Sequence, residues 1–318
     1  MGKDTSMNRS IRVIVASAII GFGCACTALA QNAPAQAVPA RGRGPAPVII
    51  GPPAPAPPEV AIPRPTAAEL GQINDAIKKF VDTDMSPTKP LLEKYESLML
   101  VQPPRLNIAA TYTQTQQRMG ARHVGFVQTA QKGDIDFLLE GDSITDWWVQ
   151  GEANKQVFDK YFGGMKTANF AIAGDTTQGN LWGLKNGEGQ SFSPKAVMLM
   201  IGTNNMGVNT APEIAEGVGA VVLELRHDFP NAKILLLAIF PRSLPADPIR
   251  EKIAETNKII SKLDDQQHVY YMDIGSKFLD DKGVFLPDSF RGDNLHPQAK
   301  GYEIWGEAVK DKLASLMK

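Results

Sequence analysis

Five short, nearly continuous apolar runs in the second half of the chain constrain its fold most. Each has the length of a β-strand, and stretches with helical periodicity separate them. The runs cover residues 135–139, 168–172, 197–201, 234–239 and 269–274. Runs without polar alternation are typical of strands buried on both faces. The pattern predicts an α/β fold, a three-layer α/β/α sandwich around a five-stranded parallel sheet.

Ahead of this domain, which spans residues 133–318, residues 66–132 are predicted to form a helical N-terminal extension. Thr66 and Glu69 match a capping box, and the apolar residues after them fall on one helical face. Two further helices are expected at residues 91–100 and 111–132. We expect the extension to pack on the domain. Within the domain, a second capping box is predicted at Thr210.

The first thirty residues have the order of an export signal. Basic residues precede an apolar stretch over residues 11–29, which ends at Ala28-Leu29-Ala30. We expect cleavage after Ala30 and therefore a periplasmic or secreted protein without a membrane span. A membrane anchor is the alternative, but Gly21 and Gly23 interrupt the apolar stretch.

Residues 31–65 are dominated by proline and alanine. Proline holds the backbone extended and removes hydrogen-bond donors, so this composition predicts a semi-rigid linker between the signal and the extension. Plain disorder is an equally good interpretation of the same composition.

Composition and motifs argue against several classes of function. Both cysteines, Cys24 and Cys26, lie in the predicted signal, so the mature protein would have no thiol for catalysis or metal binding. A formal net charge of -1 offers no basic surface for nucleic acid. The sequence also lacks a G-x-S-x-G elbow, a Walker A loop and an HExxH motif. We expect neither a cofactor nor a metal.

Four short polar segments lie where an active site would form. Three follow predicted strands and one precedes the last helix: Gly141-Asp142-Ser143, Gly174-Asp175-Thr176, Gly202-Thr203-Asn204 and Asp293-Asn294-Leu295-His296. Ligands of such sheets bind beyond the carboxyl ends of the strands, so the four segments are expected to meet there. Each alone is a common turn or cap. Their joint occurrence, in order, favours catalysis.

Ser143 is the predicted nucleophile of this site. A serine hydroxyl needs a base to take its proton and a third group to orient that base. Asp293 and His296 have a suitable spacing, in a loop followed by a helix whose first position is predicted to be Pro297.

The oxyanion of an acyl-transfer reaction needs hydrogen-bond donors that are fixed in advance. The predicted donors are the backbone N–H groups of Ser143 and Gly174 and the side-chain amide of Asn204. The glycine lets its backbone come close to the substrate.

These segments resemble the four sequence blocks of the SGNH, or GDSL, hydrolases, whose serine, glycine, asparagine and histidine match Ser143, Gly174, Asn204 and His296. The stretch at residues 169–178 is similar to platelet-activating-factor acetylhydrolase catalytic subunits. The resemblance begins near residue 135 and runs to the C-terminus. It implies a flavodoxin-like sheet and hydrolysis of short acyl esters, especially acetyl esters.

Residues 112–123 and 141–148 together resemble exported bacterial members with a helical extension, many of which act on acylated carbohydrates. Asn205, where many members have aspartate, agrees with the acetylhydrolase-like branch. Asp142, Trp147 and Asn205 are assigned to substrate binding. Trp147 and its neighbour Trp148 are alternatively interpreted as packing residues.

The preferred function is hydrolysis of acetyl-type esters, with O-acetyl groups on carbohydrates as substrates. A lysophospholipase or thioesterase of the same fold is one alternative, and a non-catalytic carbohydrate-binding protein on this scaffold is another. His227 and His268 are expected to have surface or packing roles, and His123 either joins the extension to the active-site face or is a buried hydrogen-bonding residue. Nothing in the sequence indicates an oligomeric state.

Overall fold

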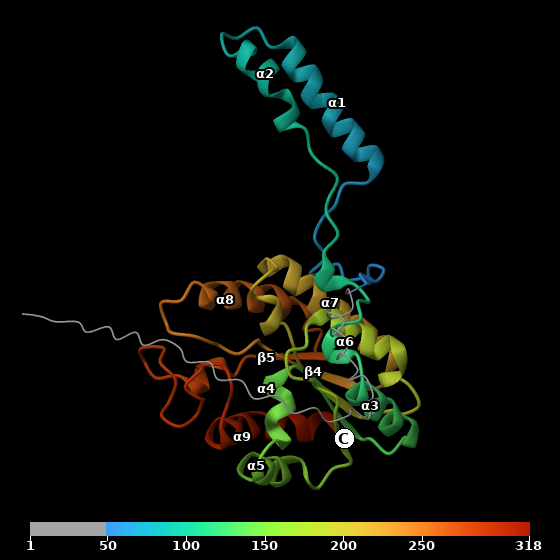
Figure 1. The fold of residues 1–318 in the computed structure, drawn as a ribbon, viewed down its shortest axis with the longest axis vertical. Helices are drawn as coiled ribbons and strands as arrows, with labels where there is room; N and C mark the ends of the chain where they lie inside the picture. The colour runs from blue at the N-terminus through green and yellow to red at the C-terminus, as the bar shows by residue number, and fades with distance from the viewer. Residues whose placement is uncertain (1–48) are drawn as a thin grey trace, which may run out of the picture. The chain divides into compact units, whose positions relative to one another are not determined.

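The computed structural model describes residues 49–318 of the chain. The predicted signal and the first part of the predicted linker lie outside the described residues. Five parallel strands form one sheet in the order β2-β1-β3-β4-β5. Strands β4 and β5 are labelled in Figure 1. The strands are β1 Phe137–Gly141, β2 Thr167–Asn169, β3 Ala196–Met200, β4 Lys233–Leu237 and β5 Val269–Met272. Each overlaps the apolar run that predicted it, and the predicted sheet is confirmed.

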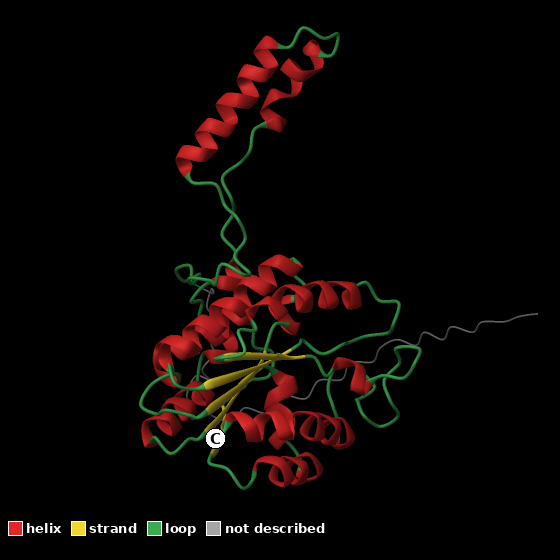
Figure 2. Ribbon diagram, turned by 180° about the vertical axis from the view of Figure 1, so that it is seen from behind, coloured by secondary structure: helices red, strands yellow, loops and turns green. Residues whose placement is uncertain are grey.

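Helices cover both faces of the sheet, which confirms the three layers (Figure 2). Successive strand residues face opposite sides. Leu138 and Leu236 lie in the core beneath α6, α7 and α8, whereas Leu139 and Leu237 lie in the core beneath α5 and α9. The helices of this domain are α4 Ser143–Asp146, α5 Glu152–Phe162, α6 Thr177–Gly183, α7 Ala211–Asp228, α8 Ile249–Ile260 and α9 Ala299–Leu316.

The predicted capping boxes are present. Thr210 and Glu213 cap α7 reciprocally, with the Thr210 N–H donating to the Glu213 carboxylate at 2.8 Å. Thr66 and Glu69 do the same for α1, which spans Ala67–Thr83 and packs against α2 at Lys89–Met99. Within residues 49–318, no helix has both the length and the apolar character needed to cross a bilayer.

The predicted start of the last helix is wrong by two residues. Helix α9 begins at Ala299, with Gln298 at the N-cap, instead of at Pro297. Pro297 instead pairs with Phe290 in an isolated antiparallel bridge. The extended backbone of that bridge is incompatible with a first helical turn, so the turn starts after it.

The helix predicted at residues 111–132 is shorter than expected. Only α3, Ala121–Lys132, is α-helical here, and the preceding residues form single 3₁₀ turns at Ile108–Ala110 and Gln116–Arg118. Asn107 donates to the Glu213 carbonyl at 2.9 Å, and the Thr177 hydroxyl donates to the Ala109 carbonyl at 2.6 Å. These long-range bonds make the segment part of the domain core, which overrides local helix formation.

Residues 49–65 also depart from the predicted tether. The Ala54 N–H donates to the Ala110 carbonyl at 2.8 Å, and the Val60 side chain is 4% exposed within the core cluster. Arg64 forms an ion pair with Glu216 of α7 at 2.6 Å. This part of the predicted linker is packed on the domain, because α7 supplies the apolar and acidic partners that composition alone does not reveal.

Candidate active site

Ser143 stands at the point where β1 turns into α4. Asp142 caps the short helix by accepting the Ile144 N–H at 2.9 Å. Gly141 is required there, because a Cβ atom would lie 2.6 Å from the Met200 carbonyl oxygen of the neighbouring strand. The tight turn places Ser143 at the carboxyl edge of the sheet, as predicted.

Ser143, His296 and Asp293 form one hydrogen-bonded row. The Ser143 Oγ lies 2.8 Å from His296 Nε2, and His296 Nδ1 lies 2.7 Å from Asp293 Oδ2. The other oxygen of Asp293 accepts the backbone N–H groups of Leu295 and His296, both at 3.0 Å. The loop therefore fixes the carboxylate, and the carboxylate fixes the imidazole ring.

The environment keeps Asp293 ionised. Partial burial acts to raise the pKa of Asp293, but the hydrogen bonds from the His296 ring and from the two backbone N–H groups outweigh it. The net effect lowers the pKa of Asp293, so this carboxylate is negatively charged beside the His296 ring at neutral pH.

The two other predicted oxyanion residues lie on connected loops. Gly174 has a φ of 81°, a left-handed conformation that favours glycine. The Asn204 side chain donates to the Asp175 carbonyl at 2.8 Å, so the loops after β2 and β3 are joined. A Cβ atom at Gly174 would lie 3.2 Å from the amide nitrogen of Gln117. This glutamine, which sequence reasoning missed, brings the extension to the predicted site.

Two of the three predicted substrate-binding residues are buried. Asp142 and Asn205 have no exposed surface in this structure. Asn205 accepts the Thr177 N–H at 3.1 Å and donates to the Gln178 side chain at 3.0 Å. Both side chains hydrogen-bond to neighbouring residues rather than face solvent, and their assignment to substrate binding stays a prediction. The motif gives the residue type but not the direction in which the side chain points.

Trp147, the third predicted residue, is half-buried and stacks on the imidazole of His296, with ring centroids 4.0 Å apart. The guanidinium of Arg291 lies 4.4 Å from the centroid of the Trp147 ring. The indole ring of Trp147 therefore contacts both His296 and Arg291. The neighbouring Trp148 is fully buried in the core. Arg291 carried no sequence signal, because its role depends on contact with a distant segment.

A buried ionic cluster that the sequence did not predict lies behind the second block. Arg118 has no exposed surface and contacts Asp175 at 2.8 Å, together with Glu140 and Glu188. Burial alone would lower the pKa of Arg118, but the three carboxylates outweigh it and raise the pKa. Burial raises the pKa of Glu140, and Arg118 opposes that rise. The cluster ties the extension to β1 and to the loop that carries Gly174.

Arg122 of α3 makes a second link between the extension and the site. It forms an ion pair with Asp146 at 2.8 Å and donates to the Ala171 carbonyl at 2.8 Å. Asp146 in turn accepts the Ala173 N–H at 3.1 Å. The helix that begins with Ser143 and the loop before Gly174 are therefore fixed to one arginine.

The remaining histidines have structural contacts. His123 bonds to Glu188 at 2.6 Å and packs on the Trp182 ring, so it is a hydrogen-bonding residue of the extension. His227 is exposed and bonds to Asp228 at 3.0 Å. The ring nitrogen of His268 lies 3.5 Å from Asp265.

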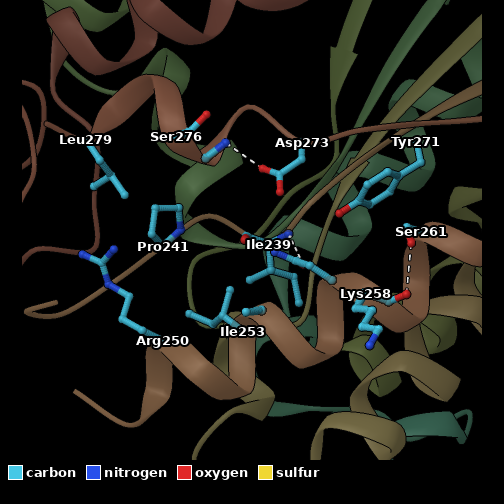
Figure 3. A pocket seen from close by; sticks show the side chains of 13 residues that line it. Ile239, Pro241, Arg250, Ile253, Lys258, Ser261, Tyr271, Asp273, Ser276 and Leu279 are labelled. Carbon is cyan, nitrogen blue, oxygen red and sulfur yellow. Dashed lines mark hydrogen bonds between the residues drawn. The ribbon is translucent and has the colours of Figure 1, made fainter. Parts of the chain in front are cut away.

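A pocket of about 480 Å³ lies beyond the carboxyl ends of β4 and β5 (Figure 3). Its walls include Ile239, Pro241 and Ile253, with the Tyr271 hydroxyl and the Asp273 carboxylate among its polar groups. None of the residues of the Ser143 row lines this pocket. It is therefore separate from the candidate active site.

Comparison with known proteins agrees with this geometry. Residues 140–304 match the GDSL-like lipase/acylhydrolase family. The chain is 35% identical over 196 residues to platelet-activating factor acetylhydrolase IB subunit alpha2 of Rattus norvegicus, covering 61% of this chain and 82% of the relative. The alpha1 subunit of Bos taurus is 30% identical with the same coverage.

A solved structure from Streptococcus pneumonia, provisionally assigned as a platelet activating factor, superposes with a TM-score of 0.51 and 22% identity, covering 60% of this chain and 91% of that chain. This likeness concerns the fold. The sequence match over more than half of the chain and the identity with the acetylhydrolase subunits establish the relationship. The chain belongs to the GDSL, or SGNH, hydrolase family and is a carboxylic ester hydrolase.

Proposed function

We propose that the protein hydrolyses short-chain, acetyl-type esters through an acyl intermediate on Ser143. The observation that carries the proposal is the hydrogen-bonded row of Ser143, His296 and Asp293, with distances of 2.8 and 2.7 Å. A hydroxyl, an imidazole and an ionised carboxylate in this order are the groups that nucleophilic acyl transfer requires.

In the proposed mechanism, His296 Nε2 takes the proton of Ser143 as its Oγ attacks the ester carbonyl. Asp293 stabilises the resulting imidazolium. The developing oxyanion accepts hydrogen bonds from the backbone N–H groups of Ser143 and Gly174 and from the second amide hydrogen of Asn204. The alcohol leaves with the proton from His296. Water, activated by the same ring, then releases the acyl group.

We further propose that the natural substrates are O-acetyl groups on carbohydrates and that the protein is exported. The named relatives are acetylhydrolase subunits, and 82% of the rat subunit's length is covered, which supports a short acyl group. The apolar segment over residues 11–29 supports export, where acetylated polysaccharides are available. A lysophospholipase or thioesterase activity is the alternative.

A substrate panel on the wild-type protein and Ser143→Ala tests this proposal. We expect hydrolysis of p-nitrophenyl acetate and of an acetylated oligosaccharide, little hydrolysis of the octanoate, and a loss of at least about a thousandfold in Ser143→Ala with an unchanged circular dichroism spectrum. Equal activity of the two proteins would overturn the mechanism. A preference for lysophospholipid or a long-chain thioester would overturn the substrate class.

A further inference from the structure

A groove of about 610 Å³ lies between the first turn of α5 and the segment that leads into α9. Most of its lining side chains are exposed and polar or charged, and they include Gln150, Glu152, Asp288, Arg291, Gln298 and Lys300. The groove differs from the pocket in Figure 3, whose walls include several aliphatic side chains.

The groove lies close to the imidazole of His296, because the Trp147 ring contacts both His296 and the groove residue Arg291. Arg291 lines the groove, and its guanidinium lies 4.4 Å from the centroid of the Trp147 ring, which also stacks on His296. The Arg291 backbone N–H also donates to the His296 carbonyl at 2.8 Å. On the opposite wall, Asn154 donates to the Trp147 carbonyl at 3.0 Å. Both walls of the groove are therefore fixed to residues that contact the catalytic ring.

The charged groups of the groove are balanced in sign. Glu152 and Asp288 supply two carboxylates, while Arg291 and Lys300 supply two cations. None of these four side chains forms an ion pair with any of the residues 49–318. In that described range, the side chains of Asp288 and Arg291 also form no hydrogen bond. Glu152 accepts a hydrogen bond from Gln156 at 2.9 Å, and Lys300 donates to the Pro287 carbonyl at 2.7 Å. Asp288 and Arg291 are therefore the groove charges whose hydrogen-bonding groups are unused within residues 49–318.

We propose that this groove binds the alcohol part of a polyhydroxylated ester, namely a sugar ring adjoining the acetylated one. Sugar hydroxyls both donate and accept hydrogen bonds, which matches a lining that contains carboxylates, amides and cations. An acyl chain would need apolar walls, and a phosphate group would need an excess of positive charge. The inference rests on the proposed function and adds to it the residues that select the alcohol.

The test compares two substrates that share an acetyl group but differ in the alcohol. One is p-nitrophenyl acetate, and the other is an acetylated β-linked oligosaccharide. The variants are Lys300→Ala combined with Asp288→Asn, and separately Ala153→Trp, which places a bulky ring in the groove from an exposed position on α5. Asparagine tolerates the positive φ of 61° at position 288.

We expect kcat/KM for the oligosaccharide, divided by that for p-nitrophenyl acetate, to fall about tenfold or more in both variants. The matched control is Lys310→Ala. It removes an exposed lysine from α9, the helix that carries Lys300, but outside the groove, and it should leave the ratio unchanged. A ratio equal to wild type in both variants would overturn the groove proposal while the esterase function stands. Activity that survives in Ser143→Ala would instead overturn the function itself.

Discussion

Asp142 shows how a motif residue acts through its burial. The carboxyl is fully buried, and this burial raises its pKa to about 7, although the Ile144 N–H opposes the rise. In the unfolded chain the same group releases its proton near pH 4. Between these values the native state binds more protons than the unfolded state. The free energy of unfolding therefore falls as the pH rises through this window.

Asp142→Asn removes this titration but keeps an acceptor for the helix cap. Relative to wild type, we expect the variant to gain at least about 1 kcal/mol in free energy of unfolding when the pH is changed from 5 to 8. Denaturant unfolding at both pH values measures the difference. The exposed control Asp281→Asn should show no such gain, and an equal difference at both pH values would contradict the prediction.

At the same scale, the sequence predicted the residues of the hydrogen-bonded row but not what surrounds them. Ser143 and His296 were accessible to prediction because nucleophilic catalysis needs particular residue types in a particular order. The burial of Asn205 was not, since the same motif allows its amide to face solvent or the protein. The contact of Trp147 with Arg291 depends on the tertiary fold.

The Arg118 side chain anchors the 3₁₀ turn at Gln116–Arg118. Arg118 is enclosed by three carboxylates and is fully buried. Arg118→Met would leave those acids without a cation, and removing one partner of a buried ion pair typically costs about 3–5 kcal/mol. We expect a loss of this size in chemical denaturation.

The comparison variant is Arg105→Ala, which breaks the ion pair between Arg105 and Glu213. The Arg105 side chain is 77% exposed, and such pairs contribute about 1 kcal/mol or less. Similar losses in the two variants would show that the Arg118 cluster does not hold the extension in place.

Strands and capped helices were predictable because their signals are local. The apolar run that became β3 and the capping box at Thr210 each lie within a few residues of the element they define. Residues 107–118 carry no such signal. Their turns depend on partners such as Glu213 and Thr177, which lie far away in the sequence.

For the molecule as a whole, residues 49–65 behave as part of the domain. The Val60 side chain packs closely against Gly219 of α7. A Cβ atom added at Gly219 would lie only 2.3 Å from a methyl group of Val60. Val60→Ala removes two buried methyl groups, and we expect a loss of about 2 kcal/mol in free energy of unfolding.

Thermal and denaturant unfolding would measure this loss. Ile50→Ala, in the same segment but 51% exposed, provides the control and should change the free energy of unfolding by no more than about 0.5 kcal/mol. If Val60→Ala were equally neutral, residues 49–65 would be a tether after all.

The approach of Gln117 to Gly174 brings the N-terminal part of the chain to the predicted oxyanion loop. Gln117 lies outside the family match at residues 140–304, yet its amide stands over a glycine of that match. Two relatives with identical catalytic blocks can therefore differ in the side chain that contacts the loop of Gly174. Exchanging only the preceding segment between such enzymes should transfer a preference for acyl size, without altering any residue that handles the proton.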